Sequence, residues 1–176
     1  MKKMSVKDYS LIGIFAALTA IMAQISIPMP LGVDMTMQTF AISLTAVVLG
    51  AKRSAVCAFI YVLIGAFGMP VFSRFSGGIG VIFGTTGGFL LSFPLMAWII
   101  GFGAQKNNNF FLIVSYIIGT AVNFIMGMLI FSLVSGSSMS AAFAACVLPF
   151  IPTTIIKSVA SAIIGLRIKR ALIKIW

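Results

Sequence analysis

Lys157 is the residue of this sequence best placed to bind a ligand, because it lies within an apolar run rather than at its edge. Pro149 precedes it by about 12 Å along a helix. A cation at that depth in a membrane costs roughly 2.5 to 3.5 kcal/mol on insertion scales, so Lys157 is expected to face a polar cavity and to meet an anion or carbonyl oxygens. The sequence holds only two acids, Asp8 and Asp34, and both lie near the ends of apolar runs. An anionic ligand would supply the missing charge, whereas snorkelling of Lys157 to the membrane surface is the structural alternative.

A glycine-rich segment, residues 71–80, is the second candidate for ligand binding, and it contains Arg74. A base in such a loop could steer an anion toward a cavity. Glycines in and after the segment permit close backbone approach and conformations that other residues avoid, so they could place amide donors against a ligand. These glycines are Gly77, Gly78, Gly80, Gly84, Gly87 and Gly88. A tight lid that never touches a ligand is the structural alternative.

Polar side chains inside the apolar runs complete the set of candidates. Gln38 opens one run, Asn123 lies in the middle of another, and Thr154 precedes Lys157 by about one helical turn. A buried amide needs hydrogen-bond partners, so each one either bridges two helices or lines a site. For Asn123 a bridge between helices is the favoured interpretation. Thr154 either satisfies backbone groups at the start of its helix or faces the cavity.

Groups for catalysis or metal binding are missing from the sequence. It has no histidine, no nucleophile elbow, no pair of carboxylates within one apolar run and no phosphate-binding loop. Its two cysteines, Cys57 and Cys146, lie in apolar stretches without CxxC spacing. We therefore expect no enzyme activity, no cofactor, no metal site and no hydrolysis of ATP by this chain itself.

The composition places these residues in a membrane protein. The chain is 61% hydrophobic and 8% charged, whereas soluble domains carry roughly 25% charged residues. Its net charge of +10 could suggest nucleic acid, but the basic residues form short clusters between apolar runs rather than a basic face. The lipid bilayer, and not nucleic acid, is the expected partner of this surface.

The apolar stretches predict an all-α integral membrane protein that forms a single domain over residues 1–176. Six transmembrane helices are expected, at about 9–27, 37–51, 54–70, 82–104, 110–134 and 147–168. Most of the 12 lysines and arginines fall on one side of this arrangement, which predicts that both termini are cytoplasmic. On the first helix, Ala16 and Ala20 suit close packing of helices, within the monomer or against a partner.

Longer strings of the sequence resemble a known family. They are AVVLGAKRSAVCAFIYVLIGAFGMPVFSRFSGGIGVIFGTTGGFLLSFP at residues 46–94, TMQT at residues 36–39, and VLPFIP at residues 147–152 followed by Lys157. In this order they resemble the BioY family, the substrate-capture subunits of energy-coupling-factor biotin transporters. The resemblance extends across nearly the whole chain.

The resemblance implies the S-component fold, with six helices around a pocket that opens to the outside, in the cell membrane of a prokaryote. It implies biotin as the ligand. It also implies two kinds of partner: a membrane coupling subunit of the EcfT type and a pair of ABC ATPases. Ala16 and Ala20 would then contact the coupling subunit.

Departures from the family pattern bear on the ligand. Thr153 and Thr154 replace the glycine and aspartate of the usual final-helix motif, and Phe89 stands where tyrosine is common. An aspartate would accept the N–H groups of the ureido ring of biotin, and threonine is a weaker, neutral acceptor. Either Thr154 with Asn123 or Gln38 still binds that ring, or the pocket has shifted to lipoate or a related carboxylic acid. We expect biotin, because so much of the glycine-rich signature is retained. A membrane scaffold or assembly protein without a transported substrate is the alternative from another class.

Overall fold

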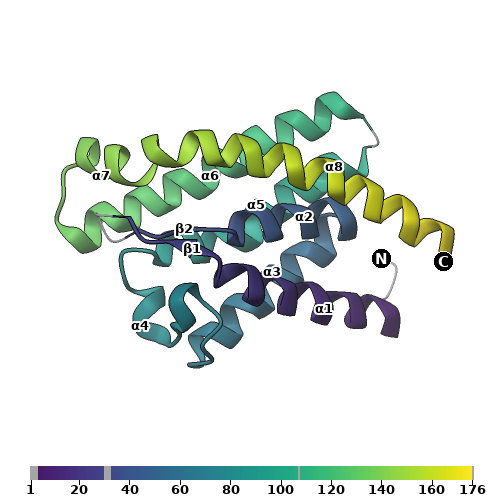
Figure 1. Cartoon of the computed structure of the whole chain (residues 1–176), viewed down its shortest axis with the longest axis horizontal. Helices are drawn as coiled ribbons and strands as arrows, with labels where there is room; N and C mark the ends of the chain where they lie inside the picture. Colours follow the sequence, from purple (N-terminus) through teal and green to yellow (C-terminus); the bar gives the residue numbers. More distant parts are fainter. Residues whose placement is uncertain (1–3, 30–32, 107, 176) are drawn as a thin grey trace.

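The computed structural model describes residues 4–29, 33–106 and 108–175. Its long helices lie side by side along one axis and run alternately in opposite directions (Figure 1). They are α1 (Val6–Ala23), α2 (Gln38–Leu49), α3 (Ala51–Ala66), α5 (Gly87–Gln105), α6 (Asn109–Ser135) and α8 (Ile151–Ile175). Short elements fill the end away from the termini: the antiparallel strands β1 (Ser26–Ile27) and β2 (Met35–Thr36), the turns η1 (Ser73–Phe75) and η2 (Leu148–Phe150), α4 (Ile79–Ile82) and α7 (Met139–Cys146).

Four segments of the described chain are long and apolar enough to cross a membrane. They are Val6–Ala23, Gly87–Gln105, Asn109–Ser135 and Met139–Leu172, which joins α7 to α8. The helix predicted at 110–134 agrees closely with α6. The helix predicted at 147–168 is displaced, because the chain turns at η2 and α8 begins only at Ile151. The helix predicted at 82–104 begins instead at Gly87, after the short α4.

The first helix starts where local side chains can cap it. Ser5 accepts a hydrogen bond from the backbone of Asp8, and the Asp8 side chain accepts one from the backbone of Ser5. Asp8 also forms an ion pair with Arg53 at 3.1 Å, which ties the start of α1 to the start of α3. These contacts place α1 several residues earlier than the predicted span at 9–27.

The link between α2 and α3 is a single residue. Gly50 has a φ of 76°, which favours glycine because it has no Cβ. Lys52 and Arg53 therefore lie in the first turn of α3 rather than in a connecting loop, which corrects the predicted boundary at residue 54.

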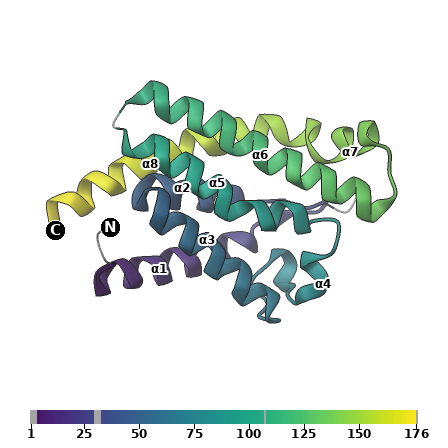
Figure 2. The same cartoon turned by 180° about the vertical axis from the view of Figure 1, so that it is seen from behind.

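Helix α2 is the centre of the bundle. Every residue of α2 except Thr39 is buried, and the helix packs against α1, α3, α5 and α8. Viewed from behind, α5 and α8 flank it on one side and α3 lies on the other (Figure 2).

Helices α5 and α6 pack closely because small residues face the neighbouring backbone. A Cβ at Gly88 would overlap the carbonyl oxygen of Met126, and one at Gly127 would overlap the Phe89 ring. A side chain at either glycine would force the two helices apart.

Two small residues of α1, Ala16 and Ala20, take part in packing within the bundle. Ala16 is buried beside Ile12 and Phe15, and the half-buried Ala20 packs against the central core. The exposed small residues of this helix are Ser10, Gly13 and Ala17. Contact of Ala16 and Ala20 with a partner stays a prediction.

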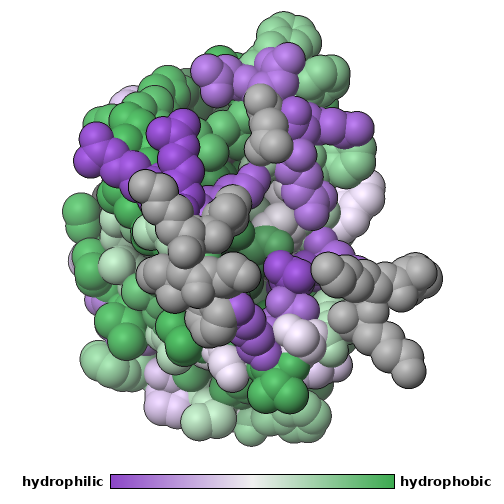
Figure 3. All heavy atoms as spheres, turned by 90° about the vertical axis from the view of Figure 1, so that its right-hand side faces the viewer, coloured by the Kyte–Doolittle hydropathy of each residue, from purple (hydrophilic) through white to green (hydrophobic). Residues whose placement is uncertain are grey.

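The two ends of the bundle differ in chemistry. The end that carries both termini gathers hydrophilic side chains, while hydrophobic residues cover the flanks (Figure 3). The described basic residues near helix ends there are Lys7, Lys52, Arg53, Lys106, Arg167, Lys169 and Arg170.

Candidate functional site

A cavity of about 370 Å³ lies toward the end of the bundle that holds β2, η1 and α4. This volume is within the range of small-molecule sites, roughly 300 to 1,000 Å³. Its wall is formed by β2, the start of α2, residues 72–86, and parts of α5, α6 and α8. Aromatic and apolar side chains supply much of its surface, namely Phe72, Phe89, Phe93, Met96, Phe124 and Phe150.

Lys157 turns into this cavity from α8. Its residue is only 9% exposed, and its Nζ donates a hydrogen bond to the carbonyl oxygen of Thr36 at 3.1 Å. The snorkelling alternative is thereby excluded, because the amine points to the interior and bonds to another segment. The carbonyl is neutral, and no carboxylate in the described chain forms an ion pair with Lys157. The amine has further N–H groups for a ligand.

The start of α2 reinforces the positive potential near Lys157. This helix begins inside the bundle, and Thr36, Gln38 and Thr39 at its start all line the cavity. The N-terminal end of a helix carries a partial positive charge and unpaired backbone N–H groups. The shortness of α2 therefore both leaves room for the cavity and favours a negatively charged or carbonyl-bearing group within it.

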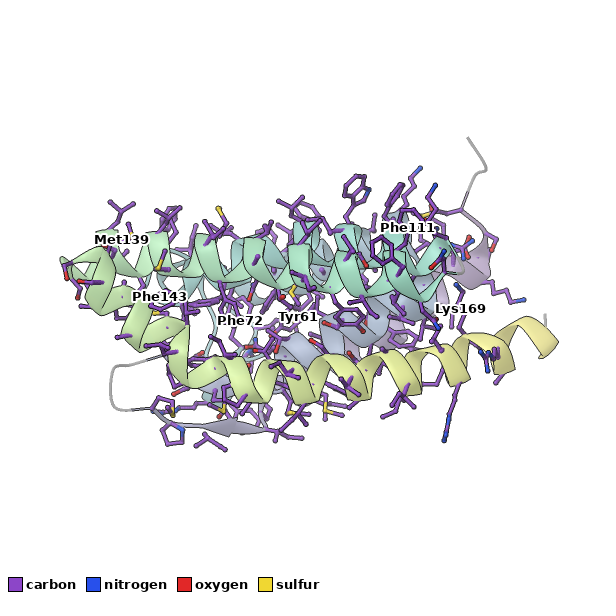
Figure 4. The ribbon with its side chains drawn as sticks, turned by 90° about the horizontal axis from the view of Figure 1, so that it is seen from above. Tyr61, Phe72, Phe111, Met139, Phe143 and Lys169 are labelled. Carbon is purple, nitrogen blue, oxygen red and sulfur yellow. The ribbon has the colours of Figure 1, made fainter. Side chains whose placement is uncertain are left out.

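Gln38 lines the cavity, but both ends of its amide are already used. Its Nε2 donates to the Tyr61 hydroxyl at 2.6 Å, and its Oε1 accepts from the Thr36 hydroxyl at 2.8 Å. Tyr61 in turn donates to the carbonyl of Val71 at 2.9 Å. Tyr61 and Phe72 lie among the interior side chains (Figure 4), with their rings edge to face at 5.7 Å. Gln38 therefore positions β2 and the loop after α3.

Asn123 differs from Gln38 because one of its amide groups, the acceptor Oδ1, is not used in the bonds to α5. Its Nδ2 donates to the carbonyl of Phe89 at 3.1 Å and to the Ser92 hydroxyl at 2.7 Å. These bonds join α6 to α5, so the predicted helix bridge is present. Because both amide hydrogens point at α5, the group that Asn123 can offer to the cavity is its acceptor, Oδ1.

Threonine hydroxyls supply the remaining polar surface of the cavity. Thr154 lines it one turn before Lys157. The Oγ1 of Thr39 is buried and has no hydrogen-bond partner within the described residues. Such a group costs free energy unless a ligand or water satisfies it. The other lining threonines are Thr36, Thr85, Thr86 and Thr120.

Arg74 lies at the rim of the cavity and is already paired. Its guanidinium contacts Asp34 at 2.9 Å, and the Ser73 hydroxyl donates to the same carboxylate at 2.7 Å. Gln24 also ties the rim, because its amide bonds the backbone of Phe72 and Phe75. The expected role of Arg74 in steering an anion is therefore weakened, since its charge is balanced within the protein.

Gly77, Gly78, Gly87 and Gly88 do not line the cavity, whereas Gly84 does. A Cβ at Gly77 would overlap the carbonyl of Met69, and one at Gly87 would overlap that of Ile82. Gly78 has a φ of 99°, and Gly88 packs against α6. Gly77, Gly78, Gly87 and Gly88 shape the backbone around the site, and their contact with a ligand stays a prediction. Phe89, in contrast, does line the cavity.

Sequence reasoning did not predict several residues of the site, and three of them, Tyr61, Ser92 and Ser73, each fix a neighbour. Tyr61 orients Gln38, Ser92 orients Asn123, and Ser73 supports Asp34. A tyrosine or serine within an apolar run indicates that its hydroxyl has a hydrogen-bond partner, but the sequence alone does not identify that partner.

Sequence comparisons give a consistent family assignment. The model of the BioY family matches residues 1–174. A probable biotin transporter BioY of Pyrococcus horikoshii is 37% identical over 169 residues, which cover 94% of this chain and 98% of that protein. A biotin transporter BioY of Thermotoga maritima is 38% identical over 159 residues, which cover 90% and 93%.

A solved structure has the same fold. It is described as the S-component for biotin from an ECF-type ABC transporter, and it superposes with a TM-score of 0.86. The match covers 96% of this chain and 95% of that chain, at 23% sequence identity.

Proposed function

Because the chain belongs to the BioY family, we propose that it is the membrane subunit that captures biotin for an energy-coupling-factor transporter. The observation that carries the proposal is the buried Lys157, which faces a cavity of about 370 Å³ and forms no ion pair within the described residues, since Asp34 at the same cavity pairs with Arg74. A small ligand with one negative charge and an apolar body suits this cavity. The transporter class agrees with the names of the relatives.

The hydrogen-bonding groups of the cavity complement those of biotin. Lys157 and the start of α2 are donors, which suit a carboxylate or ureido oxygen. Asn123 Oδ1 is an acceptor, which suits a ureido N–H. The apolar wall, with Phe89, Phe93 and Phe124, suits the bicyclic ring and the alkyl chain.

The neutral Thr154 does not argue against this ligand, because Asn123 can take over the role of an acceptor. An aspartate at 154 would place a negative charge one turn from Lys157 and would neutralise the cavity. With threonine there, the cavity keeps a net positive charge. Lipoate also carries one carboxylate, and it is the ligand against which biotin must be tested.

We further propose six membrane-spanning segments, with both termini in the cytoplasm of a prokaryote. Helices α2 and α3 would complete the count. At about 18 Å for 12 residues, α2 is shorter than a bilayer core of about 30 Å. Since α2 is buried, it need not match the lipid. The basic residues at the end with the termini support the proposed orientation.

Uptake would require partners. The sequence holds no phosphate-binding loop, so an EcfT-like coupling subunit and a pair of ABC ATPases would supply the energy. Helix α1 offers small residues for contact with the coupling subunit, namely Ala16 and the half-buried Ala20, with the exposed Gly13 and Ala17 beside them.

The first experiment identifies the ligand without choosing it beforehand. The chain is purified in detergent, denatured, and searched by mass spectrometry for a released small molecule. Biotin and lipoate are then titrated calorimetrically into ligand-free protein. We expect saturable binding of biotin and at least tenfold weaker binding of lipoate. Preference for lipoate would change the substrate and keep the transporter class, whereas binding of neither would favour the scaffold alternative.

A second experiment separates a capture subunit from a carrier. The chain alone, in liposomes, should bind labelled biotin without accumulating it inside. Accumulation that needs no ATPase would contradict the proposed dependence on partners.

A further inference from the structure

A second cavity lies at the end of the bundle that carries both termini. Its volume is about 190 Å³, and it lies between the last turn of α5, the first turn of α6 and the second half of α8. Its polar side chains are Lys169, Arg170, Asn108 and Asn109, and its apolar walls include Leu112 and Leu166. It shares no residue with the cavity around Lys157.

Lys169 is directed into this cavity by a specific bond. Its Nζ donates to the carbonyl oxygen of Ala104 at 2.8 Å. That carbonyl belongs to the last turn of α5, where no further helical N–H follows to bond it. The bond fixes the amine between α5 and α8 and leaves other N–H groups free to bind a ligand.

No acid of the protein neutralises this site. The sequence has only two acidic residues, and they form ion pairs elsewhere, Asp8 with Arg53 and Asp34 with Arg74. Within the described residues, neither Lys169 nor Arg170 forms an ion pair with a side-chain carboxylate. Two adjacent cations at a cavity therefore lack a counter-charge from this part of the chain.

Aromatic side chains mark the depth of the cavity relative to a membrane. Trp98 and Phe102 stack on the exposed side of α5 at 5.9 Å, and the Lys106 amine lies 5.1 Å from the Phe102 ring. Phe111 lies on α6 at the same end of the bundle as Lys169 (Figure 4), and it is half exposed. Aromatic rings and lysines of this kind gather at the level of lipid head groups.

The two walls of the cavity suit the two parts of a lipid. Lys169, Arg170 and the asparagine amides match the oxygens of a phosphate, while Leu112 and Leu166 continue toward the apolar body of α6 and α8. Basic pockets between membrane helices bind anionic head groups in this way. We propose that this cavity binds the phosphate of an anionic phospholipid. The proposal requires that the chain lies in a membrane, but it does not depend on the ligand of the first cavity.

The test uses the full chain in detergent and measures lipid binding by native mass spectrometry. Phosphatidylglycerol should be retained and phosphatidylcholine should be lost at the same concentration. Removal of one cation should weaken the binding of phosphatidylglycerol by about fivefold, so Arg170→Gln is expected to cost fivefold and Lys169→Gln with Arg170→Gln about 25-fold. Biotin titration of the same samples checks that the first cavity is intact.

Arg167→Gln is the matched control. Arg167 is an exposed base on the same helix and does not line the cavity, so its loss changes the net charge equally and should leave phosphatidylglycerol binding within twofold. An equal loss in the control would overturn the proposal in favour of general charge attraction. If Lys169→Gln fails to fold, because it leaves α5 uncapped, Arg170→Gln alone decides the question.

Inorganic phosphate distinguishes the source of the phosphate group. It should not displace phosphatidylglycerol at millimolar concentration, because it cannot contact the apolar wall. Displacement at that concentration, or equal retention of phosphatidylcholine, would contradict a lipid site.

Discussion

Lys157 and Lys169 lie on the same helix, about 18 Å apart along its axis, and each donates a hydrogen bond to a backbone carbonyl of another segment. Their surroundings differ. Lys157 is buried among threonines, an amide and aromatic rings, with no second base beside it in the interior. Lys169 is partly exposed, with Arg170 as its neighbour and a cluster of bases at the same end of the bundle.

This difference shows that the environment of a lysine decides which anion it can hold. A single cation removed from water favours one small, dehydrated anion and is little screened by salt. Two cations at the membrane surface favour a larger anionic group with more charge, and salt weakens their attraction to it. The predictions below test the division between these two regions, from the largest expected effect to the smallest.

The substitution Lys157→Ala should have the largest effect. It removes a charged hydrogen bond worth about 1.5 to 3 kcal/mol, so the affinity for biotin should fall roughly 10- to 100-fold in calorimetric titration. Lys169→Gln is the matched change at the other end, and it should leave biotin affinity within twofold. Similar losses in both variants would mean that the two regions are not independent.

The substitution Asn123→Leu should have the next largest effect on biotin affinity. It removes the acceptor Oδ1 and leaves the Phe89 carbonyl and the Ser92 hydroxyl without their partner, so biotin affinity should fall roughly tenfold, about 1 to 2 kcal/mol. Lipoate has no ureido N–H, and its affinity should change far less. Parallel losses for both ligands would assign Asn123 to helix bridging alone.

The substitution Thr154→Asp changes the net charge of the cavity around Lys157, which is one difference between the two regions. The new carboxylate lies one helical turn from Lys157 and should pair with it. Lipoate binding should then weaken roughly fivefold, about 1 kcal/mol, while biotin loses less because its ureido ring gains an acceptor. Thr154→Asn, of similar size and without charge, is the control. A larger loss for biotin than for lipoate would contradict the proposed complementarity.

Asp34→Asn should have the smallest effect. It breaks the ion pair with Arg74, which lies at the exposed rim and is worth about 0.2 to 1 kcal/mol. Release of biotin, followed by stopped-flow fluorescence, should accelerate about two- to threefold, and Arg74→Gln should do the same. If the rate of biotin release is unchanged in both variants, the ion pair at the rim does not retain the ligand.

Hydropathy predicted the helices that have polar residues at both ends. It failed where an apolar stretch continues through a turn. α6 follows its predicted range because Asn108 caps its start and Gly136 ends it in a left-handed conformation. The predicted helix at 147–168 includes the turn at Leu148–Phe150 and leaves out α7, because residues 139–156 carry no charge that would mark either boundary.

The residues of the site were predictable where a polar or charged side chain lies within an apolar run. Lys157 stands out as a base within an apolar run, and Gln38 and Asn123 stand out as amides. Their division into a positioning residue and a ligand-facing residue was not predictable, because it depends on Tyr61 and Ser92, which are distant in the sequence. The role of the glycines was not predictable either, since close helix packing and ligand contact favour the same residue type.

The burial of α2 has a consequence for the synthesis of the protein. Two of its neighbours, α1 and α3, are adjacent in the chain, but α5 and α8 are made later. When α2 leaves the ribosome, the residues of α5 and α8 that cover it in the fold have not yet been made. The apolar surface of α2 therefore reaches its final packing only after the last helix has been synthesised.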